Sequence, residues 1–172
     1  ETDGVDELIL DPAVKAIALT GSARAGKTVA ARAGAALKKC VLELGGSDPS
    51  IVLADADLDQ AVRSCVAGRL SNTGQDCNAV KRAIVVEDVL GEFTGKFVAL
   101  MRGMVLGDPM DPSSVIGPMS RVDLRDALHD QVLRSVAAGA TLALGGTVPD
   151  RPGAWYPPTV LTGVRPGMAA YE

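Results

Sequence analysis

The chain has 172 residues, of which 47% are hydrophobic, 22% charged and only 3% aromatic, and its formal net charge is −4 at pH 7. This length and composition are typical of a globular domain with its own core and argue against disorder. The acidic balance and the scarcity of aromatic rings exclude the basic footprint and the stacking platforms of nucleic-acid binders. No apolar run approaches the ~18 residues that a membrane-spanning helix needs. We therefore expect neither a nucleic acid nor a membrane as partner.

The chain contains three cysteines, Cys40, Cys65 and Cys77, and a single histidine, His129. An odd number of widely spaced cysteines excludes a disulfide framework and the usual structural zinc site, so we expect no metal and a reducing, cytoplasmic setting. His129 lies one position off an apolar stripe with steps of four residues, which is formed by Leu124, Leu128, Val132 and Val136. That position predicts a polar residue on a helix flank, not the base of a Cys–His or Ser–His–Asp triad.

The first elements are predicted to be a strand, a glycine-rich turn and a helix. The apolar run Val14–Leu19 indicates a buried strand, and the alanine-rich stretch Gly26–Lys39 indicates a helix whose last lysines suit the helix dipole. Strand, turn and helix make half of a βαβ unit. The turn Gly21–Gly26 would leave backbone N–H groups at the helix start, where they can bind a phosphate.

This turn also allows a second interpretation, because Gly21–Thr28 fits the P-loop pattern G-x-x-x-x-G-K-S/T. A nucleotide-binding module would place Lys27 on the phosphates and could take its second acid from the residues that follow a predicted strand at Ala83–Val86. The pattern leaves most of its positions free, in a chain with 19 glycines. A P-loop module therefore stays open as an alternative.

A second strand, Cys40–Leu44, is interrupted by Glu43 and closed by two glycines. An ionised carboxylate is costly to bury without a partner, so Glu43 is expected at the mouth of a cleft or on a solvated strand edge. At a cleft it could act as a general base.

The rest of the chain alternates strands and helices, which predicts an α/β fold with a mostly parallel sheet and flanking helices. The further expected strands are Ser50–Leu53, Ala83–Val86, Thr141–Leu144 and Thr159–Leu161. The further expected helices are Leu58–Leu70, Val89–Met101 and Asp123–Ala138. The first of them begins with a capping-box spacing, and the second has an apolar packing stripe. The proline-rich stretches 107–118 and 149–158 are expected to be loops.

Cys77 lies in Asn72–Arg82, a polar run without apolar periodicity that precedes a predicted strand. A thiol in such a loop is reachable, whereas Cys65 and Cys40 lie in predicted regular elements and are expected in the core. A lone cysteine is only a candidate nucleophile, because it can equally be a small residue in a turn.

Four stretches, in the same order, resemble motifs of the aldehyde dehydrogenase superfamily and cover nearly the whole chain. They are the cofactor turn at Leu19–Ser22 with Gly26, the glutamate motif at Leu42–Gly46, the cysteine motif at Gly74–Cys77 with Ala79 and Arg82, and a later strand entry at Tyr156 with Pro158–Leu161. Local details such as Ser47-Asp48-Pro49 look most like the succinate-semialdehyde branch of that family.

The resemblance implies oxidation of an aldehyde, with succinate semialdehyde as a candidate, to the carboxylic acid with NAD or NADP as cofactor. Cys77 would form a thiohemiacetal and then a thioester, and Glu43 would activate the water that hydrolyses it. The residues that the family motifs place at the cofactor are Gly21, Ser22, Gly26, Leu44 and Gly45. Lys27 would then be a surface residue, since the family uses no catalytic lysine in this turn.

The resemblance also implies that residues 1–43 end a dinucleotide-binding domain and that residues 44–172 belong to a catalytic domain, both partial. The family's Pro-Trp-Asn-Phe-Pro and Glu-x-Phe-Gly-Pro motifs do not occur in this chain. The chain therefore resembles the central piece of a longer enzyme, which is expected to be a homo-oligomer in its full-length form. An inactive, truncated relic that keeps the fold pattern is the remaining alternative.

Overall fold

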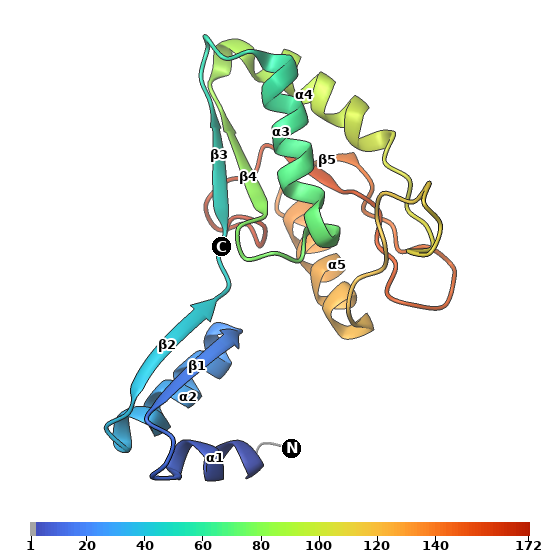
Figure 1. Ribbon diagram of the computed structural model, residues 1–172. Coiled ribbons are helices and arrows are strands. Elements are labelled where there is room, and N and C mark those ends of the chain that lie inside the picture. The colour runs from blue at the N-terminus through green and yellow to red at the C-terminus, as the bar shows by residue number, and fades with distance from the viewer. Residues whose placement is uncertain (1–2) are drawn as a thin grey trace. The chain divides into compact units, whose positions relative to one another are not determined.

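The computed structural model describes residues 3–172, which form two compact units, one ending at Ser47 and the other spanning Asp48–Glu172. The first unit contains α1 (Asp3–Leu10), β1 (Ala16–Gly21), α2 (Ala23–Ala35) and β2 (Lys39–Leu44) (Figure 1). The boundary between the units lies slightly later than the predicted division after residue 43. The assignment of the two parts to a dinucleotide-binding and a catalytic domain stays a prediction.

In the first unit α2 packs on the parallel pair β1–β2. Helix α2 begins at Ala23 because Ser22 caps it, with the Ser22 hydroxyl accepting a hydrogen bond from the Ala25 N–H at 3.2 Å. The helix ends at Ala35, and Lys39 already belongs to β2. The predicted helix Gly26–Lys39 was therefore placed too late at both ends.

The early start of α2 contradicts the P-loop interpretation. The Gly26 N–H donates to the Ser22 carbonyl at 2.9 Å, so most of the residues between the two glycines are helix and not a phosphate-binding loop. The strand predicted at Ala83–Val86, which would supply the second acid, belongs to β4. In the sheets of residues 3–172 this strand pairs with β3 and not with β1, the strand that precedes the P-loop pattern. The stretch Gly21–Thr28 therefore matches the P-loop pattern in its residue types but does not form a phosphate-binding loop.

The second unit confirms the α/β fold class. Its elements are β3 (Asp48–Val52), α3 (Leu58–Leu70), the 3-10 helix η1 (Ser71–Gly74), β4 (Val80–Val85), α4 (Glu87–Arg102), α5 (Val122–Ala137), β5 (Thr141–Leu144) and β6 (Val160–Thr162). The pair β3–β4 is parallel, as β1–β2 is, whereas β5–β6 is antiparallel. The mostly parallel pairing was predicted, but it is divided among two-stranded sheets and not gathered in one.

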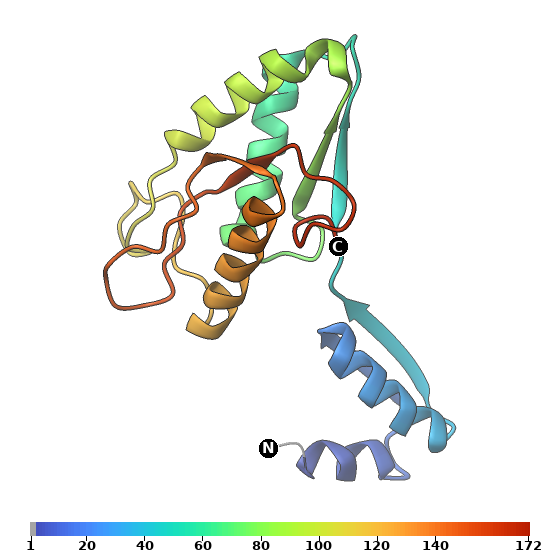
Figure 2. The ribbon, with the colours of Figure 1, turned by 180° about the vertical axis from the view of Figure 1, so that it is seen from behind.

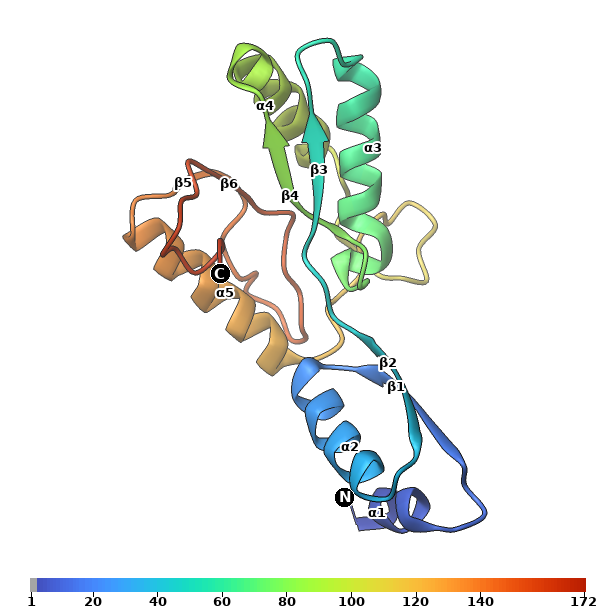
Figure 3. The same cartoon turned by 90° about the vertical axis from the view of Figure 1, so that its left-hand side faces the viewer.

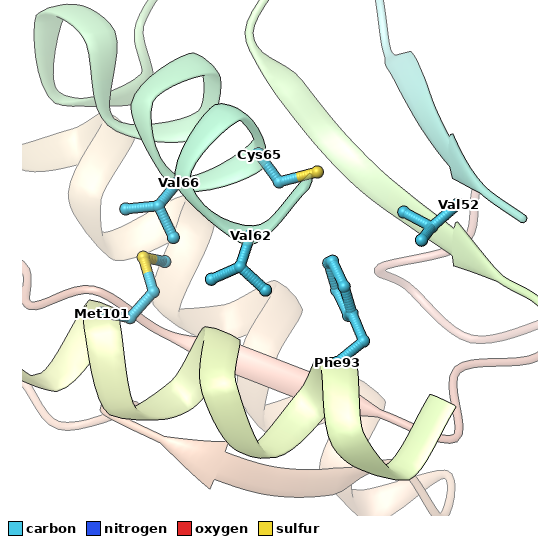
Figure 4. Close-up of a cluster of buried hydrophobic side chains, with 6 residues drawn as sticks. All are labelled: Val52, Val62, Cys65, Val66, Phe93 and Met101. Carbon is cyan, nitrogen blue, oxygen red and sulfur yellow. The ribbon is translucent and has the colours of Figure 1, made fainter. Parts of the chain in front are cut away.

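The core of the second unit lies where α3 and α4 cover one face of β3–β4 (Figures 2 and 4). Its buried side chains come from β3, α3 and α4 and are Val52, Val62, Cys65, Val66, Phe93 and Met101. Cys65 is therefore a core residue, as predicted, and its Sγ lies 3.0 Å from the Ser50 hydroxyl. Cys40, also expected in the core, is only half-buried.

The opposite face of β3–β4 is not covered by other elements of the second unit. Ile51 and Ile84 are paired across the two strands and are 65% and 51% exposed, whereas their neighbours Val52 and Val85 point into the core. Because side chains alternate between the faces of a strand, this sheet presents one packed and one uncovered apolar face.

Helix α5, drawn in orange below the labels of β5 and β6 in Figure 3, confirms the predicted helix but not its predicted face. Val132 is buried, while Leu124, Leu128 and Val136 are each more than a third exposed. The fully buried residue is Ser135, whose hydroxyl donates to the Gln131 carbonyl and accepts a hydrogen bond from the Ala170 N–H.

Candidate active site

Cys77 lies in the short loop between η1 and β4, and its side chain is exposed, as predicted. Two residues later, Ala79 is only 1% exposed, and its N–H donates to the Asp76 carbonyl at 3.3 Å. The loop is thus anchored in the unit's interior while it presents the thiol to solvent. This is the exposure that a nucleophilic cysteine needs and that a structural one lacks.

Two charged side chains beside Cys77 are tied to the loop. The Lys81 ammonium donates to the carbonyl oxygens of Asp76 and Cys77 at 3.4 and 3.3 Å. The Asp76 carboxylate accepts a hydrogen bond from the Ser71 hydroxyl at 2.7 Å. Sequence reasoning missed this role of Lys81, for which the only sign was a basic pair directly after the loop.

The turn that leads into the Cys77 loop is left-handed. Asn72, Thr73 and Gly74 have φ values of 47°, 59° and 76°. For residues other than glycine this conformation costs roughly 1–2 kcal/mol each. Such local strain persists only where surrounding contacts hold it, and it clusters at functional sites.

The loop 117–120 supplies some of those contacts. The Ser120 N–H donates to the Gln75 side-chain oxygen at 2.9 Å, and the Thr73 hydroxyl lies 3.5 Å from the Gly117 carbonyl. The Met119 N–H in turn donates to the Ala154 carbonyl at 2.8 Å. The Cys77 loop is therefore supported by segments far away in the sequence.

In the first unit, Glu43 is an exposed residue of β2 and pairs with Thr20 of β1. Its carboxylate is exposed to solvent, as both of the positions that the sequence allowed require. Its role as a general base stays a prediction, as does the role of Cys77 as nucleophile.

Four of the five residues predicted at the cofactor gather at the carboxyl ends of β1 and β2. Gly21 and Leu44 are paired at those ends, Ser22 caps the following helix, and the exposed Gly45 continues from β2. In α/β sheets ligands bind at the carboxyl ends of the strands. The role of these four residues in binding a dinucleotide stays a prediction.

The fifth predicted residue, Gly26, has a packing role. A Cβ atom on Gly26 would lie 2.8 Å from both terminal methyl carbons of Leu44. The missing side chain thus lets α2 lie close to β2, directly behind the cofactor candidates. Because its N–H is used inside the helix, Gly26 supplies no free backbone donor.

The family comparison bears on the whole chain, because the sequence profile described as "Aldehyde dehydrogenase family" matches residues 1–172. This chain belongs to the aldehyde dehydrogenase family. The family resemblance of the four ordered motifs is thereby confirmed. Within residues 3–172 of this aldehyde dehydrogenase chain, no cluster of His, Cys, Asp or Glu side chains could hold a metal ion. Nor does any helix of that range have the length and apolar character needed to cross a membrane.

Individual relatives agree with the family assignment. The NAD(P)+ succinate semialdehyde dehydrogenase Sad of Escherichia coli is 54% identical over 172 residues, which are 100% of this chain and 37% of the relative. The NADP+ succinate-semialdehyde dehydrogenase of Deinococcus radiodurans is 50% identical, over 98% of this chain and 35% of its own length. The chain thus spans about a third of the length of these curated aldehyde dehydrogenases.

Solved structures show the same fold. Gox0499 matches with a TM-score of 0.94 and 46% identity over 98% of this chain and 37% of its own. The succinate-semialdehyde dehydrogenase of Burkholderia pseudomallei matches with a TM-score of 0.93 and 33% identity over 97% of this chain and 35% of its own.

Proposed function

We propose that this chain is part of an NAD(P)+-dependent aldehyde dehydrogenase that oxidises succinate semialdehyde to the dicarboxylic acid. The observation that carries the proposal is the exposed Cys77, held in an anchored loop of a chain that belongs to the aldehyde dehydrogenase family. The substrate is inferred from relatives that are named as succinate-semialdehyde dehydrogenases and are 54% and 50% identical to this chain. The activity belongs to the full-length protein.

Cys77 starts the reaction as a thiolate that attacks the aldehyde carbon and forms a carbon–sulfur bond. The carbonyl oxygen becomes an oxyanion and needs a hydrogen-bond donor. Within residues 3–172 the Cys77 N–H makes no hydrogen bond, so this backbone group is available to the oxyanion. Loss of hydride from the same carbon then leaves a thioester on Cys77.

Glu43 acts in the second half of the reaction as general base. Its carboxylate takes a proton from a water molecule, whose oxygen attacks the thioester carbon. The carbon–sulfur bond breaks, the carboxylic acid leaves, and Cys77 returns to the thiolate. The exposed position of Glu43 on its strand keeps the carboxylate accessible to water without the cost of burying its charge.

Gly21, Ser22, Leu44 and Gly45 are the residues proposed to hold the cofactor, with Gly26 keeping α2 close behind them. When bound, NAD(P)+ supplies the hydride acceptor. The capped start of α2 favours a negatively charged group such as a pyrophosphate beside Ser22.

The free thiols of the chain suit a reducing compartment such as the cytoplasm. We expect the full-length enzyme to be a homo-oligomer that acts on a small aldehyde.

The test follows NADH and NADPH formation by the full-length protein with succinate semialdehyde. We expect Cys77→Ala to abolish turnover, because no other exposed thiol of the described residues can form the thioester. Cys40→Ala removes a thiol from the first unit and serves as the matched control that retains activity. Normal steady-state turnover by Cys77→Ala would refute the assignment.

A second experiment separates the two halves of the reaction. In Glu43→Gln, rapid mixing should show a single burst of reduced cofactor followed by slow turnover, because the thioester forms but is not hydrolysed. Glu7→Gln, a matched change at an exposed glutamate of α1, should turn over normally. Absence of a burst together with unchanged steady-state turnover in Glu43→Gln would remove Glu43 from the mechanism.

A further inference from the structure

Arg69, near the end of α3, reaches forward over the left-handed turn. Its guanidinium Nη2 donates to the Gly74 carbonyl at 2.6 Å. The guanidinium also lies against the Gly74 Cα, so that a Cβ on Gly74 would come within 2.7 Å of Arg69 Cζ. The Arg69 guanidinium can therefore lie here only because residue 74 has no side chain.

The environment of Arg69 is unusual for an arginine. The side chain is half-buried, and none of the ion pairs among residues 3–172 involves it. Burial lowers the pKa of its guanidinium, as expected for a cation removed from water without a carboxylate partner. Partial burial of the Arg69 charge without an ion pair costs solvation free energy, and the charge-assisted hydrogen bond from Arg69 to the Gly74 carbonyl offsets part of this cost.

The loop 117–120 also contacts this turn. There the Ser120 N–H donates to the Gln75 side chain, and the Thr73 hydroxyl contacts the Gly117 carbonyl. Arg69 and this loop therefore both contact the segment Thr73–Gln75 that precedes Cys77. Neither contact reaches the thiol itself.

We propose that Arg69 is a positioning residue that clamps the Asn72–Gly74 turn in its left-handed conformation and thereby sets the place of the Cys77 thiol. The inference rests on the proposed function, in which Cys77 is the nucleophile. Reacting groups must be held within a fraction of an ångström, and a small displacement of a nucleophile reduces the rate of the chemical step more than it reduces substrate binding.

The test compares Arg69→Gln, Arg69→Lys and Arg63→Gln in the full-length protein. Arg63 lies on the same helix and is exposed, and within residues 3–172 no hydrogen bond or ion pair joins it to the turn, so it is the matched control for loss of an α3 charge. Two readouts are needed. One is steady-state oxidation of succinate semialdehyde, and the other is amide hydrogen exchange of residues 58–82 without substrate.

For Arg69→Gln we expect kcat to fall about tenfold or more with little change in KM, because the nucleophile is displaced while substrate contacts remain. Exchange should speed up about tenfold for the amides of residues 72–79 but not within α3. Arg69→Lys keeps one donor for the Gly74 carbonyl and should fold even if Arg69→Gln does not. Its kcat and its exchange rates should lie between those of Arg69→Gln and those of the unmodified enzyme. Arg63→Gln should match the unmodified enzyme in both readouts.

Three results overturn the clamp. The first is unchanged hydrogen exchange of residues 72–79 in Arg69→Gln. The second is equally faster exchange throughout α3, which would mark Arg69 as an ordinary helix-stabilising residue. The third is an unchanged kcat although the amides of the loop exchange faster. If the unmodified full-length protein oxidises no aldehyde, the proposed function fails instead, and the exchange data alone decide whether Arg69 holds the turn.

Discussion

His129, the only histidine of the chain, contacts Tyr156 through its ring. The His129 Nδ1 lies 3.1 Å from the Tyr156 hydroxyl, and the two rings meet edge-on with centroids 5.7 Å apart. Tyr156 is only 5% exposed, and burial raises the pKa of its hydroxyl. The pair therefore joins α5 to the segment before β6 through a neutral tyrosine. His129 was predicted to be a polar residue on the helix flank, and the structure shows it half-buried against Tyr156.

We expect Tyr156→Phe to lower the free energy of unfolding by about 1 kcal/mol at pH 8, because it leaves the half-buried His129 Nδ1 without this partner. The raised pKa of Tyr156 adds a pH dependence. A group whose folded pKa lies above its unfolded value of about 10 stabilises the fold below that pH and loses this contribution as pH rises further. Urea unfolding should therefore show the difference between the two proteins shrinking above pH 10.

Tyr171→Phe is the matched control, because Tyr171 is 48% exposed. Its unfolding should stay within about 0.5 kcal/mol of the unmodified protein at all pH values. A Tyr156→Phe variant as stable as this control at pH 8 would show that the contact with His129 contributes nothing.

At the scale of elements, α3 sets the position of β4, the strand that follows the Cys77 loop. A Cβ on Gly68 of α3 would lie 2.9 Å from the Val80 Cγ2 at the start of β4. Valine is stiff at χ1, so Val80 cannot rotate away easily. The close approach of helix and strand thus depends on a glycine inside a helix, where alanine would otherwise be preferred.

We expect Gly68→Ala to lose about 1 kcal/mol of stability, because overpacking of about 1–3 kcal/mol outweighs a helix-propensity gain of about 1 kcal/mol. Adding Val80→Ala removes the overlap, so a double-mutant cycle measured by urea unfolding should show a favourable coupling. Gly95→Ala in α4, where a Cβ meets nothing within 4 Å, should instead stabilise the protein. Additive effects of Gly68→Ala and Val80→Ala would mean that the helix and strand separate freely.

The joint between α3 and α4 has an ionic part. The Lys96 ammonium of α4 lies 2.6 Å from the Asp59 carboxylate of α3 and 2.9 Å from Glu92 on its own helix. The hydrogen bond from Lys96 lowers the pKa of Asp59. A carboxylate with a lowered folded pKa stabilises the fold above its unfolded pKa of about 4, and this contribution is lost as pH falls toward the folded pKa.

Asp59→Asn should therefore lower the melting temperature slightly at pH 7 and at low salt, and the difference should vanish as pH falls below about 4. Asp55→Asn, at an exposed aspartate in the loop before α3, is the control for the loss of one charge. A difference that persists unchanged at pH 3.5 would assign the effect of Asp59→Asn to something other than the ion pair.

Local signals predicted some elements well. Helix α3 was predicted with its observed bounds because the Asp57 cap and the apolar spacing act within a few residues, and the Asp57 carboxylate does accept from the Gln60 N–H. Helix α2 was misplaced because its alanine-rich sequence has no sharp period and the cap at Ser22 was read as part of a turn. The left-handed turn before Cys77 could not be predicted, since Arg69 and the loop 117–120 impose it through contacts.

For the whole molecule, the same limit applies to the uncovered faces. A strand with alternating exposure, such as β3 with Ile51 outward and Val52 inward, indicates only that its two faces differ. The alternation within the strand does not encode which other segment covers its outward face. Because the chain spans about a third of its relatives' length, we expect the open β3–β4 face to be buried in the full-length protein.

The double substitution Ile51→Ser with Ile84→Ser tests this expectation, because it should benefit the 172-residue chain and harm the full-length protein. In the 172-residue chain alone it should reduce binding of a hydrophobic dye and improve solubility, because it removes an exposed apolar pair. In the full-length protein it should destabilise the fold by about 2–5 kcal/mol for each residue, because buried methyl groups are lost. Met110→Ser, at a loop residue that is 88% exposed, should change neither protein's stability by more than about 0.5 kcal/mol. Destabilisation of equal size in both proteins would show that the isoleucines act within this chain alone, and no destabilisation of the full-length protein would show that the face stays open to water.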